Sequence, residues 1–153
     1  MTRGKVSADV LADRLAWVGR MIACIRQLPL ADRHAFFADE RNVFAAESCL
    51  RRALEALLDA GRHILAKGFA VAIAEYKQIA RELARHEVLD EREADLLERM
   101  AGYRNRMVHF YHDVTADELY TLCTEHLSDL ETLCEAYRRW ARVNADRLDQ
   151  AVG

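Results

Sequence analysis

Ten consecutive residues bring together side chains that could do chemistry. The segment YRNRMVHFYH at positions 103–112 mixes two arginines, an asparagine, two histidines and two tyrosines with apolar residues. Imidazole groups transfer protons near neutral pH, so general acid–base chemistry is the reaction that the histidines suit. Met107, Val108 and Phe110 alternate with the polar residues and are residue types of a core. The segment is therefore either the polar end of a core helix or an active site built on one.

The whole chain has the size and composition of one globular domain. It has 153 residues, of which 52% are hydrophobic and 31% charged, and its net charge is -3. We therefore expect a single helical domain over residues 1–153 that buries a substantial core. The chain lacks both a membrane-length apolar run and the apolar region of a signal peptide, so we expect a cytoplasmic protein without membrane contact. Its mild acidity argues against broad nucleic-acid binding but allows a local phosphate site.

Apolar periodicity and stop signals predict an all-α, up-and-down bundle of five helices. One proline and six glycines leave little room for strands. We expect helices over residues 7–27, 39–67, 71–85, 90–113 and 115–144, with Gly68 ending the second. The four cysteines show no CxxC spacing, so we expect buried, reduced thiols and no metal site.

Two capping signals predict where the motif lies on its helix. DERE at 90–93 is an Asp-x-x-Glu box, and TADE at 115–118 is a Thr-x-x-Glu box. Because the second box starts a new helix, His109, Tyr111 and His112 would lie in the last turn of the preceding one. A histidine at that end feels the negative end of the helix dipole, which favours its protonated form. The same position leaves these side chains at an edge of the bundle, where a ligand can reach them.

Helix geometry separates the two strongest candidates. On an ideal helix Arg104 and His109 are about 140° apart around the axis and about 7.5 Å apart along it. Each also has a structural explanation, because an arginine stem can cover core surface and a helix-end histidine can bond a carbonyl. Either the long Arg104 side chain reaches round to share a substrate, or a neighbouring helix or second subunit brings another copy of the motif close.

The motif resembles a known signature. MAGYRNRMVHFYHDV is similar to that of the HEPN superfamily, specifically the HepT toxins, whose motif is Arg-x4-His-x-Tyr. Arg104, His109 and Tyr111 fill this pattern without a gap. RNVFAAESCLRRALEALLDAGRHIL also resembles the second helix of the family, so the resemblance covers about residues 7–143.

The resemblance implies a metal-independent endoribonuclease that needs no cofactor and acts as the toxin of a type VII toxin–antitoxin pair. In such enzymes the ribose 2′-hydroxyl of the RNA substrate attacks the adjacent phosphorus. His109 would move a proton, Arg104 would bind the phosphate and stabilise charge growing on it, and Asn105 would orient one of them. Family members form homodimers in which two motifs face one cleft, which would resolve the angular separation.

Tyr111 has a different implied role. In the family this tyrosine is adenylylated by the partner antitoxin, a minimal nucleotidyltransferase named MntA. The added AMP would place bulk and negative charge where the RNA phosphate should bind. His112, beside it, is a possible supporting residue.

Glu47 is a second possible supporting residue. It lies within about 60° of the apolar ridge of the second predicted helix, an odd place for an unpaired carboxylate, and an ion pair with Arg104 would explain it. A glutamate at the edge of the helix, with its carboxylate in water, would explain the position of Glu47 equally well. Glu55, further round the helix, is a weaker candidate for the same ion pair with Arg104. Two other functions stay open: a catalytically silent HEPN module that binds a nucleotide or a nucleotidyltransferase, and a purely structural helical adaptor.

Overall fold

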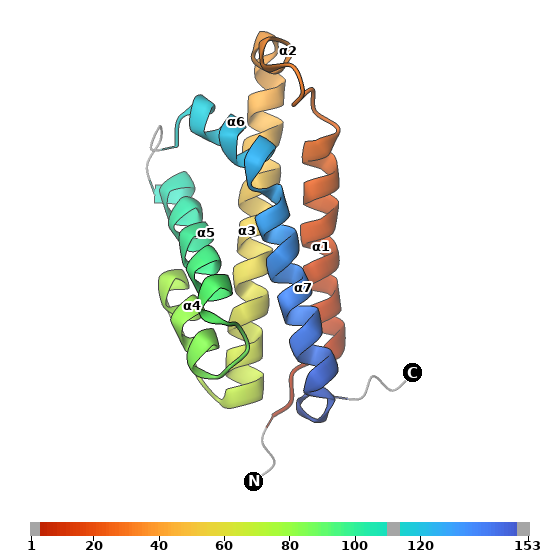
Figure 1. Ribbon diagram of the computed structural model, residues 1–153, viewed down its shortest axis with the longest axis vertical. Coiled ribbons are helices and arrows are strands. Elements are labelled where there is room, and N and C mark those ends of the chain that lie inside the picture. The colour runs from red at the N-terminus through yellow and green to blue at the C-terminus, as the bar shows by residue number, and fades with distance from the viewer. Residues whose placement is uncertain (1–3, 110–113, 150–153) are drawn as a thin grey trace.

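The computed structural model describes residues 4–109 and 114–149, with only the backbone of His109. Within these ranges the regular secondary structure is helical, apart from one isolated bridge between Val6 and Leu148, which confirms the predicted all-α class (Figure 1). The helices are α1 (Ala8–Arg26), α2 (Arg33–Ala38), α3 (Glu40–Phe69), α4 (Tyr76–Arg85), α5 (Glu91–His109), α6 (Ala116–Glu125) and α7 (Leu127–Val143), followed by a 3-10 turn at Ala145–Arg147. None of these helices has the length and apolarity that a membrane crossing requires.

Helix α3 is the axis of the bundle. It has 30 residues, and it contacts each of the other six α-helices in the described ranges. Figure 1 shows α1 on one side of it, α4 and α5 on the other, and α7 in front, with α6 crossing its upper half. Because neighbours pack on several sides, α3 buries a broad apolar face instead of a narrow stripe. Its fully buried members include Leu54, Leu57, Leu58, Ile64 and Leu65.

Two glycines of α3 let neighbouring segments approach its backbone closely. A Cβ atom at Gly61 would lie 2.7 Å from the Tyr137 hydroxyl oxygen, and one at Gly68 would lie 3.1 Å from Val6 Cγ2. Gly68 was predicted to end this helix, and that prediction is wrong. The helix continues to Phe69, and Ala70 adopts the left-handed conformation (φ 56°) that glycine usually supplies. Close packing is therefore what the glycine at position 68 provides.

The structure divides the chain into more helices than the five predicted. The segment predicted as one helix over 115–144 breaks at His126, whose φ of -119° and ψ of 3° are not helical. The apolar repeat runs through the break, so periodicity did not reveal it. The predicted loop after α1 contains α2, whose first turn is capped by Asp32, and the helix predicted over 71–85 begins only at Tyr76. Cys123 and Cys134 are buried as expected, whereas Cys24 is exposed and Cys49 is only half-buried, so the expectation of buried thiols is wrong for these two.

Both predicted capping signals start helices. Asp90 Oδ1 accepts from the Glu93 backbone N–H at 2.8 Å, and Glu93 Oε1 accepts from the Asp90 N–H at 3.0 Å, which is a complete capping box. In the second box the Thr115 hydroxyl accepts from the Glu118 N–H at 3.1 Å. The Glu118 carboxylate instead binds both terminal nitrogens of Arg106, at 2.7 and 2.8 Å. This ion pair ties the end of α5 to the start of α6.

Candidate functional site

Helix α5 carries Arg104, Asn105 and His109 of the motif and directs Arg104 between α3 and α4. The helix is continuous from Glu91 to His109, so Arg104, Asn105 and His109 are all on regular helical backbone. The Arg104 side chain is only 21% exposed, which is low for an arginine. A charge in such a position needs partners, and these come from both neighbouring helices.

Glu55 of α3 and Tyr76 of α4 hold the Arg104 guanidinium. Its Nε lies 3.5 Å from Glu55 Oε1, and its central carbon lies 4.5 Å from the centre of the Tyr76 ring. The Arg104 Nη1 also donates to Asn105 Oδ1 at 3.4 Å. The Nε contact is an ion pair by distance, but Nε is buried and makes no hydrogen bond within the described part of the chain. Charge attraction and stacking, more than directed hydrogen bonds, therefore position this guanidinium.

Tyr76 stands at the centre of this arrangement. Its hydroxyl donates to Asp59 Oδ1 at 2.9 Å, and a second guanidinium, that of Arg62, lies 4.6 Å from the ring centre. Arg62 is itself 3.6 Å from Asp59. Burial, followed by the hydrogen bond to Asp59, raises the pKa of the Tyr76 phenol above its usual value, so the ring stays neutral. The negative face of a neutral aromatic ring attracts cations, and here it serves two arginines.

The acidic partner of Arg104 is Glu55 and not Glu47. Glu55 Oε1 also lies 3.5 Å from Arg51 Nη1, so the carboxylate is shared between two arginines. Glu47 is eight residues earlier on α3, is exposed, and forms no ion pair with any described residue. The ion pair predicted for Glu47 is thus made by the glutamate that sequence reasoning ranked lower.

The remaining candidates lie partly or wholly outside the described residues. Tyr111 and His112 fall within positions 110–113, and the side chain of His109 is likewise not described. Their roles stay predictions. Because α5 is helical through His109, the angular separation of about 140° from Arg104 applies to its backbone.

Two exposed apolar side chains lie on the same helix faces as the Arg104 contacts. Phe44 is 64% exposed, and its position eleven residues before Glu55 puts it within about 20° of that residue around α3. Val108 is 45% exposed and lies one turn after Arg104 on α5. Phe44 is about 16 Å from Glu55 along α3, so of the two only Val108 adjoins the Arg104 site.

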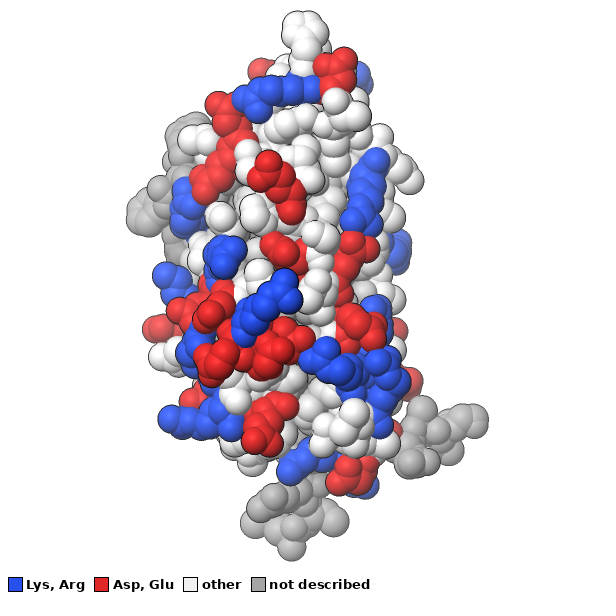
Figure 2. Space-filling model, in the orientation of Figure 1, with Lys and Arg blue, Asp and Glu red and all other residues white. Residues whose placement is uncertain are grey.

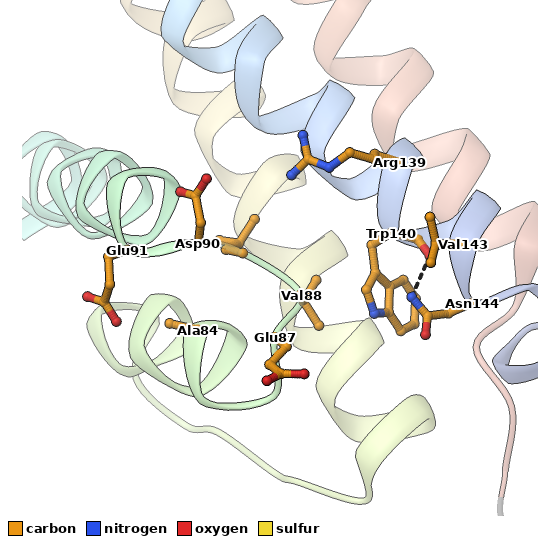
Figure 3. A pocket seen from close by; sticks show the side chains of 10 residues that line it. Ala84, Glu87, Val88, Asp90, Glu91, Arg139, Trp140, Val143 and Asn144 are labelled. Atoms are coloured by element: carbon orange, nitrogen blue, oxygen red, sulfur yellow. Dashed lines mark hydrogen bonds between the residues drawn. The ribbon is translucent and has the colours of Figure 1, made fainter.

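A separate cavity of about 470 Å³ lies far from the motif, between the α4–α5 loop and the end of α7 (Figure 3). Most of the charged groups around it have partners within the protein. Arg139 binds Glu93, Asp90 caps the first turn of α5, and Glu91 pairs with Arg81. These contacts fix the junction of α4, α5 and α7, and among the described residues Glu87 is the lining carboxylate with neither an ion pair nor a side-chain hydrogen bond.

The family of the chain follows from its sequence over most of its length. A profile of the family described as "Ribonuclease HepT-like" matches residues 20–137, more than half of the chain. No curated protein matches the chain significantly.

Solved structures of similar fold include toxins from toxin–antitoxin complexes. A tri-AMPylated Shewanella oneidensis HEPN toxin in complex with its MNT antitoxin aligns with a TM-score of 0.77 at 24% identity, covering 86% of this chain and 98% of that one. A toxin–antitoxin complex with AMP-PNP aligns at 0.75 and 23%, with the same coverage. The Bacillus subtilis protein YutE, described as a cytosolic protein of unknown function, aligns at 0.74 and 20%, covering 91% of this chain and 94% of that one. At these identities the structures show a shared fold, and the profile match over residues 20–137 shows that this chain belongs to the HepT-like family.

Proposed function

We propose that this protein is the toxin of a HepT/MntA-type toxin–antitoxin system and a metal-independent endoribonuclease. The observation that carries the proposal is the intact Arg-x4-His-x-Tyr motif of the sequence, whose arginine on α5 is held half-buried by Glu55 and Tyr76. An arginine that only covered core surface would not need a stacking ring and a shared carboxylate. Preorganised positive charge is what a reaction that builds negative charge on phosphorus requires.

In the proposed reaction the ribose 2′-hydroxyl attacks the adjacent phosphorus and the bond from phosphorus to the 5′-oxygen breaks. A base removes the proton of the 2′-hydroxyl, and an acid protonates the departing 5′-oxygen, leaving a 2′,3′-cyclic phosphate and a 5′-hydroxyl. His109 supplies proton transfer, and Arg104 binds the phosphoryl oxygens. Asn105, which accepts a hydrogen bond from Arg104, helps to orient the guanidinium.

The proposal includes a homodimer. Arg104 and His109 do not share a helix face, so one motif alone places its two functional groups apart. Val108 beside Arg104 on α5, and Phe44 further along the same face of α3, are exposed apolar side chains that a second subunit would bury. In such a dimer, Arg104 of one subunit and His109 of the other can line one cleft.

The proposal also includes control by modification. Adenylylation of Tyr111 by an MntA-like nucleotidyltransferase would add a phosphate two residues from His109, and its charge would compete with RNA for Arg104. The structural similarity to an AMPylated toxin bound to its antitoxin supports this part. The description of YutE as cytosolic supports a cytoplasmic location.

Expression and cleavage assays test the proposal. Induction of the wild-type protein should arrest growth, and Arg104→Ala and His109→Ala should each relieve the arrest. Glu47→Gln, an exposed change on α3, is the matched control and should remain toxic. Variants as toxic as the wild type, or purified protein that leaves all RNA intact, would contradict the nuclease.

A silent HEPN module that binds a nucleotide or a nucleotidyltransferase is the second candidate. The two exposed apolar residues favour it equally, since a partner protein would cover them as well as a second subunit does. It predicts a complex with the nucleotidyltransferase but no RNA cleavage by the dimer or the monomer.

A further inference from the structure

An open depression of about 270 Å³ lies between α1 and α3, beside the Arg104 site. Its walls are Arg14 and Trp17 of α1 and Arg52, Glu55, Ala56 and Asp59 of α3. Glu55 is also the carboxylate that contacts Arg104, and Asp59 is the acceptor for Tyr76. One row of α3 side chains therefore separates this depression from the motif arginine, and a ligand at Arg104 can extend into it.

Several arginines gather around this depression. The charged residues of its lining are Arg14 and Arg52 with Glu55 and Asp59, so the charges of the lining balance. Further arginines contact the lining: Arg51 and Arg104 lie beside Glu55, Arg62 lies beside Asp59, and Arg20 stacks on Trp17. The face with α7 in front carries interspersed acidic and basic side chains (Figure 2). Arginines clustered on one part of a surface are an electrostatic footprint of phosphate binding.

Two of these arginines have no competing acid. Arg14 and Arg52 are exposed, and neither forms an ion pair with any residue in the described ranges. Both carboxylates of the depression are already occupied: Glu55 lies between Arg51 and Arg104, and Asp59 accepts from Tyr76 and lies near Arg62. The guanidinium groups of Arg14 and Arg52 are therefore available to an anion from outside.

Trp17 adds an aromatic surface to the charge. It is half-buried in α1 and lines the depression, and the guanidinium of Arg20 lies 4.9 Å from its ring centre. Proteins that bind single-stranded nucleic acid combine a basic groove with aromatic rings on which bases stack. The occupied carboxylates keep free lone pairs that can accept from ribose hydroxyl or base amino groups.

We propose that this depression is a subsite for single-stranded RNA, in which one base stacks on Trp17 and the adjoining phosphates bind Arg14 and Arg52. It would hold a nucleotide next to the one cleaved at Arg104. The inference rests on the proposed nuclease function, because it assigns the RNA a path from the motif arginine across α3 to α1. The proposal requires a single-stranded substrate, because a base that is paired and stacked in a duplex cannot stack on Trp17.

Binding measurements test the subsite. The probe is a short fluorescent oligouridine, bound to protein carrying His109→Ala so that the RNA stays intact, and anisotropy is measured over a range of salt concentrations. Trp17→Leu should weaken binding by about tenfold, from a stacking contribution of about 1–3 kcal/mol per base, and Trp17→Phe should restore most of it. The double change Arg14→Gln with Arg52→Gln should lower the slope of log K against log salt by about 1.4, since each phosphate contact on a single strand contributes about 0.7.

A charge-matched control and a cleavage assay separate the possible outcomes. Arg138→Gln with Arg142→Gln removes two exposed arginines from α7 and should leave the salt slope unchanged. In the active protein, Trp17→Leu should raise KM for a long RNA with little change in kcat, and should not affect a dinucleotide that cannot reach α1.

Equal binding by the wild type and the Trp17 and Arg14/Arg52 variants, in a protein that still cleaves RNA, overturns the subsite and leaves the nuclease standing. If those variants bind RNA more weakly but the wild-type protein cleaves no RNA, the depression is an RNA-binding site and the nuclease proposal is overturned. A lower salt slope in the α7 control as well would mean that net charge, and not this depression, binds the RNA, which also overturns the subsite.

Discussion

Replacing Tyr76 by leucine should slow RNA cleavage about fivefold, whereas replacing it by phenylalanine should change the rate by less than about twofold. The Arg104 guanidinium lies 4.5 Å from the ring centre, within the range of an effective cation–π contact. Such contacts contribute about 0.5–1 kcal/mol when exposed and about 2 kcal/mol when desolvated. Because Arg104 is 21% exposed, about 1 kcal/mol is appropriate, which corresponds to about fivefold in rate.

The two substitutions differ in what they remove. Leucine removes the ring and the hydroxyl, so Arg104 loses its stacking surface. Phenylalanine keeps the ring and removes only the hydrogen bond from Tyr76 to Asp59. That loss should lower the free energy of unfolding by about 1 kcal/mol without moving Arg104.

The assay is single-turnover cleavage of a single-stranded RNA, with thermal unfolding of each variant measured alongside. The stacking explanation requires the leucine variant to be slower than the phenylalanine variant while both stay folded at the assay temperature. Equal rates for the two variants, whether both slow or both normal, would refute it.

Three further predictions concern α3 and its neighbours. Glu55→Gln should lower kcat/KM by about two- to fivefold, the effect of a partly exposed ion pair worth about 0.5–1 kcal/mol, while Glu47→Gln should cleave RNA at the wild-type rate. Gly61→Ala should lower the free energy of unfolding by about 1–3 kcal/mol, because the added methyl group clashes with Tyr137 of α7. Gly19→Ala is the control: nothing lies within 4 Å of the added group, so the free energy of unfolding should rise by about 0.5–1 kcal/mol. Urea titrations measure both changes. His63 Nε2 accepts a hydrogen bond from the Ser7 backbone N–H, just before α1. Burial and the nearby cations Lys67 and Arg14 lower the pKa of His63 in the folded protein. As the pH falls, the unfolded chain therefore binds a proton at this histidine before the folded chain does. Stability should therefore fall as the pH drops below about 6.5 and stay level above it, and His63→Gln should remove this dependence in unfolding titrations.

Local sequence signals predicted the framework of the motif well. The capping boxes at Asp90 and Thr115 depend on residues three apart, so their hydrogen bonds can be deduced without knowing the rest of the fold. The apolar periodicity of α1 and α3 likewise reflects local geometry. By contrast, the break at His126 interrupts no apolar repeat, so the sequence pattern contains no signal for it, although α6 and α7 both pack on α3.

The environment of Arg104 could not be deduced in the same way. Choosing between Glu47 and Glu55 requires knowing which side of α3 faces α5, and an angle measured from the α3 apolar ridge does not contain that information. Tyr76 falls on the apolar stripe that Ile79 and Leu83 form on α4, and nothing local indicates that its ring meets two arginines. Trp17 and Arg14 lie on a helix about 90 residues earlier in the chain than Arg104, so only the fold brings them near the motif.

Analysis of the RNA ends made by the purified protein tests the central claim most directly. A single-stranded RNA is incubated in EDTA with the wild type, Arg104→Ala or His109→Ala, and the 3′ ends of the fragments are identified by mass spectrometry. The proposed reaction predicts 2′,3′-cyclic phosphate ends, or the phosphates they hydrolyse to, from the wild type alone. Intact RNA with the wild type, or the same fragments from both variants, would contradict it.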